Sequence, residues 1–490
     1  PRRFSMYKSI QQFCESGTIN LDKICAEFFE DPQDIAGFVR KIKDEFLKHA
    51  CAYISDAFEE MDEMIRSSGI RIDKWNIVRR DMKSMLTSIG EIRYRKTLYK
   101  NKRSGKRTYL LDRVLGIEEG ARMTEDAEAQ MIEEAVQSSY RRAAEEVSIL
   151  GNVSRSTVMN RLHSLKFPKA EIPEKKKQVP YLYIDADEDH VSLQYLMQKG
   201  DIARGSDGRK NNNVQVKLVY VYEGIGPENP GSKRYRLINP RYFSGVYEGN
   251  RNAELWNEVS EYIESHYDMG SIKKIYLNAD GGGWIKGHRR KLDQVIEVLD
   301  EYHINKYLTK MTSHLGDSAS DGRSMLRDVI RTGTKAEFDE LVERLKEYGD
   351  GADAARIRQS AGYIKGNWIA AKVRLERKEG VVGSSTEGHV SHVLAGRMSS
   401  RPLGWSKRGA DRMGKLRAYY CNRGSMLQLV RYQKTEREER NRKERSLVGE
   451  ILRSCSKRHA ANGKYYDKIQ RSISSQIIKK LAIRDHLIVV

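Results

Sequence analysis

Four short apolar segments, with one amphipathic stretch among them, constrain the fold of this chain more than any other feature. The segments read as strands and cover residues 181–184, 214–224, 233–245 and 272–277. Residues 252–267 predict a helix, because its apolar residues, beginning with Leu255 and Trp256, fall on one side. Strands, then a crossover helix, then a further strand is the order of a mixed α/β sheet. We therefore expect an α/β fold in this part of the chain.

Acidic residues follow the first and the fourth of these strands. Four acids, including Asp185 and Asp187, stand within residues 185–189, and Asp280 precedes Gly281–Gly283, which would let backbone or substrate pass close to it. If the two strands are neighbours in one sheet, Asp187 and Asp280 converge, and converging carboxylates bind Mg²⁺ or Mn²⁺. A pair of such ions can activate a water or a 3′-hydroxyl in phosphoryl transfer. A loop of capping acids is the alternative, and these segments alone leave both open.

A third acid for such a site is expected on a helix further along the chain. Residues 384–386 are Ser-Ser-Thr, which is typical of a helix start, and Glu387 falls in the first turn. His389, His392 and Arg397 on the same helix are candidates to face phosphates. Zinc binding by the two histidines is an alternative, although no third ligand stands near them in the sequence.

The charge of the chain bears on its partners. It has 88 Lys and Arg against 68 Asp and Glu, a formal net charge of +20. A basic protein of this size usually meets a polyanion, most often nucleic acid, and a basic surface without a polymer partner is the alternative. No run of about 18 apolar residues suggests a membrane span. The five cysteines are scattered and never in CxxC spacing, which fits a reducing cytoplasm and argues against disulfides.

Residues 139–165 have the spacing of a helix-turn-helix. A first helix would end near Leu150, a turn would follow at residues 151–152, and Ser154 would cap the second helix. Its small core would consist of Ala143, Ala144, Val147, Val153, Val158 and Leu162. The second helix would present residue types that read base edges and bind phosphates, namely Arg155, Ser156, Thr157, Asn160 and Arg161. Plain helical hairpins share this pattern, so DNA binding and simple packing both stay open.

Four longer motifs occur in order along the chain: YLYIDADEDHVSLQ from residue 181, IYLNADGGGWI from 275, VLDEYHINKYL from 298 and STEGHVSHVLAGRMSSRPLGWSKRGADRM from 385. Together with YLLDRVLGI at residues 109–117, they resemble the DDE transposases of bacterial insertion sequences, specifically the ISLre type. The Mutator-like transposases are more distant relatives of that type. The resemblance runs from about residue 90 to 420.

The resemblance implies an RNase H-like catalytic domain whose triad falls on Asp187, Asp280 and Glu387. These three carboxylates would hold two Mg²⁺ or Mn²⁺ ions. Asp185 is the fallback for the first acid, because it projects from the same strand face two residues earlier.

Further residues match the family pattern beside the triad. Asp300 and His303 would support the ligands or position the substrate, and a helix-end histidine held by packing is the alternative for His303. Arg401 and Trp405, in the segment RPLGWS, would contact DNA.

The organisation of the chain follows from the same patterns. Residues 289–311 read as one helix, and the long separation of Asp280 and Glu387 implies a helical insertion. The expected segments are a helical region (1–88), a basic hairpin around Ser104-Gly105 (89–120), the helix-turn-helix DNA-binding region (121–172), the first part of the RNase H-like domain (173–310), the helical insertion (311–378), the last part of that domain (379–425) and a basic helical tail (426–490).

The expected function is that of a DNA transposase. It would bind the terminal inverted repeats of its own insertion sequence, cleave a strand at the element end and join the end to target DNA. Its partners would be double-stranded DNA and further copies of itself, in a dimer or larger synaptic assembly at the nucleoid of a bacterial cytoplasm. A DNA-binding regulator or domesticated relic without catalysis is one alternative. An RNase H-like nuclease that joins no ends is another.

Overall fold

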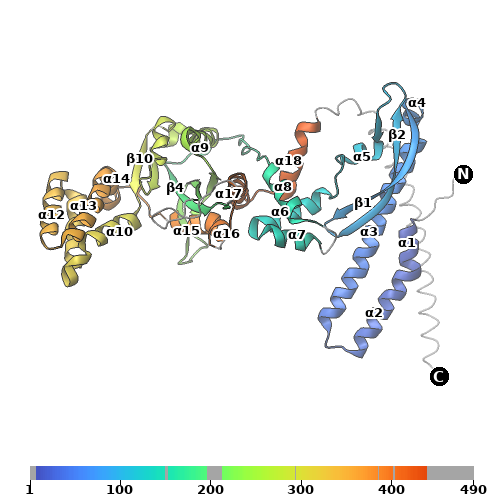
Figure 1. The fold of residues 1–490 in the computed structure, drawn as a ribbon, viewed down its shortest axis with the longest axis horizontal. Helices are drawn as coiled ribbons and strands as arrows, with labels where there is room; N and C mark the ends of the chain where they lie inside the picture. The colour runs from blue at the N-terminus through green and yellow to red at the C-terminus, as the bar shows by residue number, and fades with distance from the viewer. Residues whose placement is uncertain are drawn as a thin grey trace. The chain divides into compact units, whose positions relative to one another are not determined.

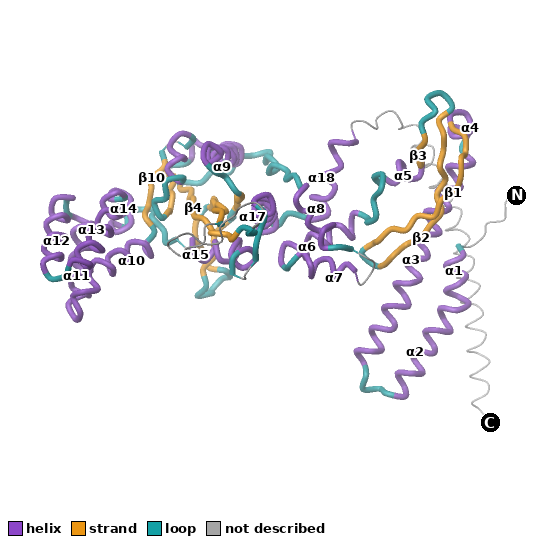
Figure 2. Tube along the Cα trace, viewed as in Figure 1, coloured by secondary structure: helices purple, strands orange, loops and turns teal. Residues whose placement is uncertain are grey.

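The computed structural model describes residues 7–148, 153–195, 212–292, 294–384, 386–400 and 403–438. The chain forms two compact units, drawn in Figures 1 and 2. The first comprises Pro1–Glu134, Arg141–Arg155 and Val430–Val490, and the second Ala135–Tyr140 and Ser156–Leu429. None of the helices in the described ranges combines the length and apolar character that a bilayer crossing requires.

Helices and a three-stranded sheet make up most of the first unit. The helices are α1 (Lys8–Gln12), α2 (Thr18–Glu30), α3 (Ile35–Ser67), α4 (Gly69–Lys74) and α5 (Leu110–Leu115). The strands β1 (Trp75–Thr87), β2 (Gly90–Asn101) and β3 (Arg107–Tyr109) pair antiparallel in chain order. The predicted turn at Ser104-Gly105 is confirmed between β2 and β3. Ile65 of α3 packs in the core with Trp75, Met85 and Tyr94.

The prediction of helix up to residue 88 is wrong from Trp75 onward. Most residues of β1 are exposed, so its sequence lacks the alternation of a half-buried strand. Pairing with β2 from Trp75 to Thr87 fixes the strand instead. Tertiary pairing has overridden the local pattern here.

Three helices follow: α6 (Glu125–Gln137), α7 (Tyr140–Ser148) and α8 (Arg155–Ser164). The last two occupy the places of the predicted helix-turn-helix, and α8 begins directly after Ser154. Residues 149–152, with the predicted turn, lie outside the described residues. Five of the six predicted core residues are buried, namely Ala143, Ala144, Val147, Val158 and Leu162, and Val153 is half-buried.

A five-stranded mixed sheet forms the centre of the second unit, which confirms the α/β prediction. Its strands are β4 (Tyr181–Ser192), β5 (Asn213–Tyr222), β8 (Arg241–Gly245), β9 (Lys274–Ala279) and β10 (Val295–Leu299). They lie in the order β10-β9-β4-β5-β8. The strands β4, β9 and β10 run parallel, whereas β5 is antiparallel to both of its neighbours.

Two secondary-structure predictions need correction, one of a strand and one of a helix. Residues 233–245 are two strands, because Asn239 adopts a left-handed conformation with φ of 49° before Pro240. The first, β7 (Tyr235–Ile238), pairs with β6 (Gly224–Pro227) in a separate ribbon. Residues 289–311 are not one helix, since β10 precedes α10 (Glu301–Thr312). Val295–Leu299 pairs with β9, and this pairing outweighs the helical spacing.

Helix α9 (Asn252–His266) covers one face of the sheet with the predicted apolar side. Leu255, Trp256, Val259 and Ile263 are fully buried there against residues of β4, β5 and β9, including Ile184 and Val221. Because side chains alternate along a strand, Asp185 and Asp187 point to the opposite face from Ile184 and Ala186.

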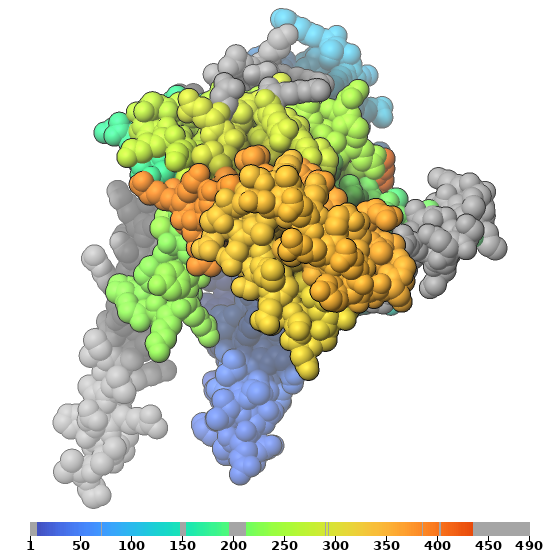
Figure 3. Space-filling model, turned by 90° about the vertical axis from the view of Figure 1, so that its left-hand side faces the viewer, coloured from blue at the N-terminus to red at the C-terminus, as the bar shows by residue number. Residues whose placement is uncertain are grey.

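A helical subdomain with its own core follows β10. It consists of α10, α11 (Ala319–Thr332), α12 (Lys335–Glu347), α13 (Gly351–Gly366) and α14 (Trp368–Glu376). Leu308, Leu326, Phe338 and Ile364 belong to that core. The subdomain faces the viewer in Figure 3, in yellow to orange. It begins at α10, ten residues before the insertion that the sequence predicted.

Short helices complete the described path of the chain. After the subdomain come α15 (Thr386–Val390), a π-helical turn (Ser391–Ala395) and α16 (Gly396–Met398). Next are α17 (Lys407–Cys421), which packs on β8, and α18 (Met426–Glu438). The rest of the predicted tail, residues 439–490, lies outside the described residues.

Candidate active site

The carboxyl ends of the parallel strands β4 and β9 bring Asp187 and Asp280 to neighbouring positions. Asp185 is aligned with Asn278, and Ala186 with Ala279, so Asp187 and Asp280 occupy the next places on adjacent strands. Asp280 directly follows β9, as predicted. Asp187 lies inside β4 instead of past its end, because β4 continues along β5 as far as Ser192. Adjacent strands lie about 4.8 Å apart, so the two carboxylates share one edge.

Asp187 lacks a cationic partner among the described residues. It is half-buried, and the backbone N–H of Glu188 donates a hydrogen bond of 2.8 Å to its Oδ1. Burial raises the pKa of Asp187 to about 7, and the carboxylates of Asp280 and Glu188 add to the rise, whereas His303 opposes it. Carboxylate oxygens near a second carboxylate are the ligands that a hard divalent cation prefers. The donor set therefore fits a Mg²⁺ or Mn²⁺ ion.

The glycine-rich turn after β9 holds Asp280 in place. The N–H of Gly282 donates to Asp280 Oδ1 at 2.8 Å, and the hydroxyl of Tyr363 donates to the backbone carbonyl of Asp280. Gly281 has a φ of +85°, and a Cβ atom there would lie 2.4 Å from Oδ1 of Asn367. Glycine is needed at this position because of its positive φ, and the close neighbour is the side chain of Asn367, not the backbone or substrate that the sequence predicted.

Asp300 and His303 stand at the end of the third parallel strand, β10. The N–H of Asp300 donates to the carbonyl of Ala279 at 3.1 Å, which places it beside the residue before Asp280. Ser384 donates to Asp300 Oδ1 at 2.7 Å, and His303 Nδ1 lies 3.3 Å from Asp300 Oδ2. The hydrogen bond to Asp300 raises the pKa of His303, and Asp280 contributes to the rise. The pair thus adjoins the two aspartates.

Asp185, the fallback for the first acid, is fully buried and saturated with donors. Its carboxylate accepts hydrogen bonds from Tyr220 (2.7 Å), Tyr222 (3.1 Å), Asn278 (2.6 Å) and Thr386 (3.3 Å). Burial raises its pKa to about 6, although these donors oppose the rise. An acid with both oxygens engaged is a structural group, which favours Asp187 as the ligand.

Arg374 of α14 extends this buried network and was missed in the sequence. Its guanidinium donates to Asn278 Oδ1 (2.6 Å) and to the carbonyls of Leu299 (3.1 Å) and Val382 (2.6 Å). The side chain is 4% exposed, and it joins the helical subdomain to β9 and β10. Asn278 could have been recognised from the sequence, because it precedes Asp280 by two residues and so shares its strand face. No pattern in the sequence points to Arg374, which lies on a helix of the insertion.

Glu387 lies in the first turn of α15, as predicted, and is exposed. Its neighbour Thr386 is buried and ties α15 to Asp185. Among the described residues, no three His, Cys, Asp or Glu side chains are grouped closely enough to hold a metal ion. The structure thus brings Asp187 and Asp280 together, and does not gather Glu387 with them into such a group. The ring of His389 lies 4.7 Å from that of Tyr220 at an angle of 40° and hydrogen-bonds with the hydroxyl of Tyr242, whereas His392 is exposed.

The predicted DNA contacts divide into exposed and buried residues. On α8, Arg155, Ser156, Thr157 and Asn160 are exposed and Arg161 is half-buried. Arg397 is 6% exposed: it donates to the carbonyl of Ala135 and lies over the rings of Tyr140 and Trp405. Trp405 is buried too and donates to the carbonyl of Met398. The prediction that Arg397 and Trp405 contact DNA does not fit their interior positions. Arg401 lies outside the described residues.

Comparison with known proteins identifies the family. Residues 31–436 match the model of UPF0236, an uncharacterised protein family. This chain belongs to the UPF0236 family.

Its relatives include a UPF0236 protein of Caldanaerobacter subterraneus subsp. tengcongensis, 34% identical over 414 residues, which are 83% of this chain and 79% of the relative. The name of another from the same organism, 33% identical over 414 residues and 83% of each chain, joins eleven locus designations. Among solved structures, the Drosophila P element transposase strand transfer complex is similar at a TM-score of 0.22 and 9% identity, over 66% of this chain and 83% of that chain. We draw no conclusion from so low a TM-score. The UPF0236 match spans β4, β9, β10 and α15, and thus every candidate acid described above.

Proposed function

We propose that this UPF0236 protein is a DNA transposase of the ISLre-like DDE type. One observation carries the proposal: Asp187 and Asp280 come directly after the last paired residues of the parallel strands β4 and β9, and Asp187 is a half-buried acid with acidic neighbours and no ion pair in the described structure. Like charges are held together in this way where a cation is to bind. A site for a divalent cation on a basic chain is what phosphoryl transfer on nucleic acid requires.

The sheet supports an RNase H-like assignment. Three antiparallel strands in chain order (β4, β5, β8), a covering helix α9, and two further strands added parallel to β4 on its other side make up that topology. The subdomain from α10 to α14 stands between the second acid and Glu387, where the resemblance implies a helical insertion. A relative with eleven loci in one organism also suits the proposal, since many copies in one genome are typical of mobile elements.

In this proposal Asp187, Asp280 and Glu387 hold two Mg²⁺ or Mn²⁺ ions. Such ions lower the pKa of an attacking water or 3′-hydroxyl and stabilise the leaving oxygen. Asp300 orients His303 beside Asp280, so that the imidazole positions the DNA strand or its attacking group. The buried bonds from Asn278 and Thr386 to Asp185 hold β4, β9 and α15, which carry the three ligands, to one another.

DNA binding completes the proposal. On α8, the exposed residues Arg155, Ser156, Thr157 and Asn160, together with half-buried Arg161, bind the terminal inverted repeats. Target DNA meets the carboxylate edge. Two element ends must be joined in one reaction, so we propose a dimer or larger synaptic assembly.

The test is cleavage of labelled duplexes that carry the two ends of the element, with Mg²⁺ or Mn²⁺, by the wild type and by Asp280→Asn. The substitution removes a ligand charge at nearly constant shape, so we expect nicking at the ends to fall about 10³-fold while DNA binding survives. Glu254→Gln is the control, because Glu254 is an exposed acid of α9, which covers the opposite face of the sheet.

Each of the other outcomes would indicate a different function or a different active site. Binding without nicking by the wild type, when both ends are present, would make it a regulator or relic. Nicking without strand transfer would indicate a nuclease that joins no ends. Equal nicking by Asp280→Asn would show that the active site lies elsewhere.

A further inference from the structure

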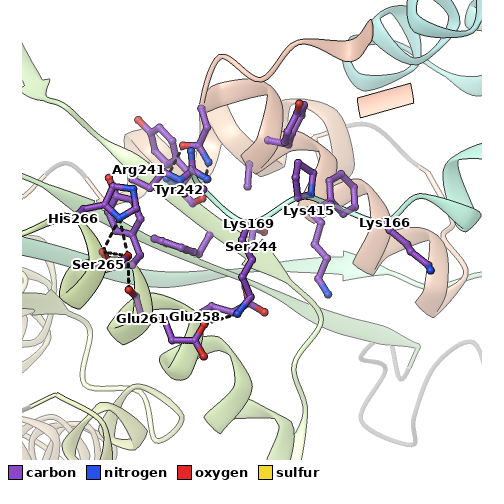
Figure 4. Close-up of a pocket in the computed structure, with 18 of the residues that line it drawn as sticks. Lys166, Lys169, Arg241, Tyr242, Ser244, Glu258, Glu261, Ser265, His266 and Lys415 are labelled. Atoms are coloured by element: carbon purple, nitrogen blue, oxygen red, sulfur yellow. Dashed lines mark hydrogen bonds and ion pairs between the residues drawn. The ribbon is translucent and has the colours of Figure 1, made fainter. Parts of the chain in front are cut away.

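A cavity of about 590 Å³ opens beside β8, the edge strand of the five-stranded sheet (Figure 4). Its walls come from β8, α9, α17 and residues 166–172. The volume lies within the range of small-molecule sites, about 300–1,000 Å³. Neither Asp187 nor Asp280 lines it, so the cavity is separate from the carboxylate edge.

On the outer edge of β8, one residue has a backbone N–H and a carbonyl without hydrogen-bond partners in the described structure. Asn422 occupies both groups of Tyr242, accepting from its N–H at 2.8 Å and donating to its carbonyl at 2.9 Å. The N–H of Val246 donates to Asp411 at 3.1 Å. Alternate residues of an antiparallel strand turn their backbone groups to the same edge, so Ser244, between these two, faces outward as well. Among the described residues, its N–H and carbonyl have no partner on that edge.

This gap is too short for a peptide strand. A strand added to the edge would need the backbone groups of Tyr242 and Val246, which side chains already occupy. One donor and one acceptor on a single residue match the edge of a flat heterocycle that offers one acceptor and one donor, as nucleobases do.

Three residues that line the cavity carry buried polar side-chain atoms without partners in the described structure. Ser244 is 4% exposed, and its Oγ has no hydrogen-bond partner in the described structure. The Nε atoms of Arg241 and Arg412 are buried without a partner too. Buried polar atoms are normally hydrogen-bonded, so these three atoms leave hydrogen-bonding capacity unused in residues that line the cavity.

The remaining walls suit a base and a phosphate. Phe167, Tyr262 and Tyr419 supply aromatic surface, and the guanidinium of Arg241 lies 5.6 Å from the ring of Tyr262. Three acids, Glu258 and Glu261 in the lining and Asp411 beside it, stand against five basic residues, namely Lys166, Lys169, Arg241, Arg412 and Lys415. Lys169 pairs with Glu261 at 2.7 Å, and Arg412 and Lys415 lie 3.7 and 3.5 Å from Asp411, which leaves a net positive lining. Such a balance favours an anionic ligand, and aromatic rings next to arginine are surfaces on which bases stack.

We propose that this cavity binds a nucleotide, with its base edge on the backbone of Ser244 and its phosphate among the basic residues. The nucleotide is either free in solution or extruded from bound DNA. The site does not depend on the carboxylate edge, and the Asp280→Asn variant should bind the ligand as the wild type does.

The free source is tested by calorimetric titration of the full-length protein with dAMP, dGMP, dCMP and dTMP, each against its nucleoside and against inorganic phosphate. We expect saturable binding of at least one nucleotide, about tenfold tighter than its nucleoside because of the charged phosphate contacts. The extruded source is tested with a duplex that carries one unpaired 2-aminopurine, whose fluorescence changes when the base leaves the stack and enters the cavity.

Two variants and a control locate the binding. Arg241→Gln should weaken whichever probe binds about tenfold, and Ser244→Ala about threefold to fivefold. Arg236→Gln removes the same charge from exposed β7 and should have no effect. Because the Ser244 hydroxyl has no partner, Ser244→Ala should leave the melting temperature of the free protein unchanged or raised, which separates ligand loss from damage to the fold.

The outcomes decide between the sources or overturn the proposal. Binding of a mononucleotide that Arg241→Gln weakens supports the free source, and a response of the 2-aminopurine duplex alone supports extrusion. The proposal is wrong if neither probe responds, or if both variants bind as tightly as Arg236→Gln.

Discussion

In the first unit the buried acids face donors, whereas in the second unit Asp187 faces other acids. Asp112 forms an ion pair with Lys96, and both are less than 10% exposed. Asp62, fully buried, accepts from the N–H (2.9 Å) and the hydroxyl (2.6 Å) of Thr97. Asp187 has a single backbone donor and two carboxylate neighbours.

In the proposed function this difference separates structural acids from a metal-ligand site. A buried charge costs free energy unless it is paired and hydrogen-bonded. The first unit meets that condition at both oxygens of Asp62 and, through Lys96, at Oδ2 of Asp112, whereas Oδ1 of Asp112 has no partner in the described structure. At Asp187 the condition is unmet in the protein alone: the raised pKa favours the protonated form, and in the proposed function a divalent cation would stabilise the ionised one. The comparison can be tested by removing the donors to Asp112 and Asp62 in the first unit and the charge of Asp187 in the second.

The largest effect is expected when the ion pair of the first unit is broken. Lys96→Met leaves the carboxylate of Asp112 buried and unpaired, so we expect the free energy of unfolding to fall by about 3–5 kcal/mol in urea denaturation. Lys100→Met, on the exposed side of β2, is the control and should change it by less than about 0.5 kcal/mol. Adding Asp112→Leu to Lys96→Met should restore most of the loss. A loss below about 1 kcal/mol would mean that the pair does not hold this unit together.

A smaller effect is expected at Thr97. Thr97→Val removes the hydroxyl donor to Asp62 but keeps the backbone donor, and should cost about 1–3 kcal/mol at pH 7. Burial raises the pKa of Asp62, and the Thr97 hydroxyl opposes the rise. A raised pKa means that the folded state binds the proton more tightly, so stability from this group is lost as pH rises above about 4. The hydroxyl limits that loss, and the cost of Thr97→Val should therefore shrink towards pH 4.

Thr108→Val, in β3 of the same sheet, is the matched control for Thr97→Val, since no hydrogen bond of the Thr108 hydroxyl is found in the described structure. A cost that stays constant between pH 4 and 7 would show that the hydroxyl does not act on the ionised carboxylate.

The sequence predicted the sheet and one edge of its site because both depend on local patterns. The apolar strands, the amphipathic α9 and the Asp280-glycine turn are each written in consecutive residues. Period-two alternation also placed Asp185 and Asp187 on one face. The alternation does not show which of the two carboxylates already accepts hydrogen bonds at both oxygens, because the donors Tyr220 and Tyr222 come from the neighbouring strand β5.

Residues that act through distant partners escaped prediction. Arg374 reaches Asn278 from an insertion helix, and no spacing rule connects them. Arg397 was expected at phosphates, yet the rings of Tyr140 and Trp405 offer its guanidinium a place in the interior. The strand β10 was read as helix, because its pairing with β9 depends on residues about twenty positions earlier.

The smallest expected effect, and the sharpest for the comparison, concerns Asp187. Asp187→Asn removes one of three neighbouring carboxylates, so without divalent ions the free energy of unfolding should rise by about 1 kcal/mol, the equivalent of roughly one pKa unit. Mn²⁺ should raise the melting temperature of the wild type by about 2–4 °C and leave that of the variant unchanged, since ligand binding stabilises only a protein that has the site.

Asp185→Asn is the matched control for Asp187→Asn, two residues earlier on the same face of β4. An asparagine amide cannot accept from all four donors of Asp185, so this variant should lose stability with or without Mn²⁺. If Asp187→Asn loses stability in the same way, Asp187 is a structural acid like Asp62 and Asp112, and the contrast between the two units disappears. If it gains stability but Mn²⁺ still stabilises the variant, the cation binds without Asp187, and the ligands must be sought among Asp280, Asp300 and Glu387.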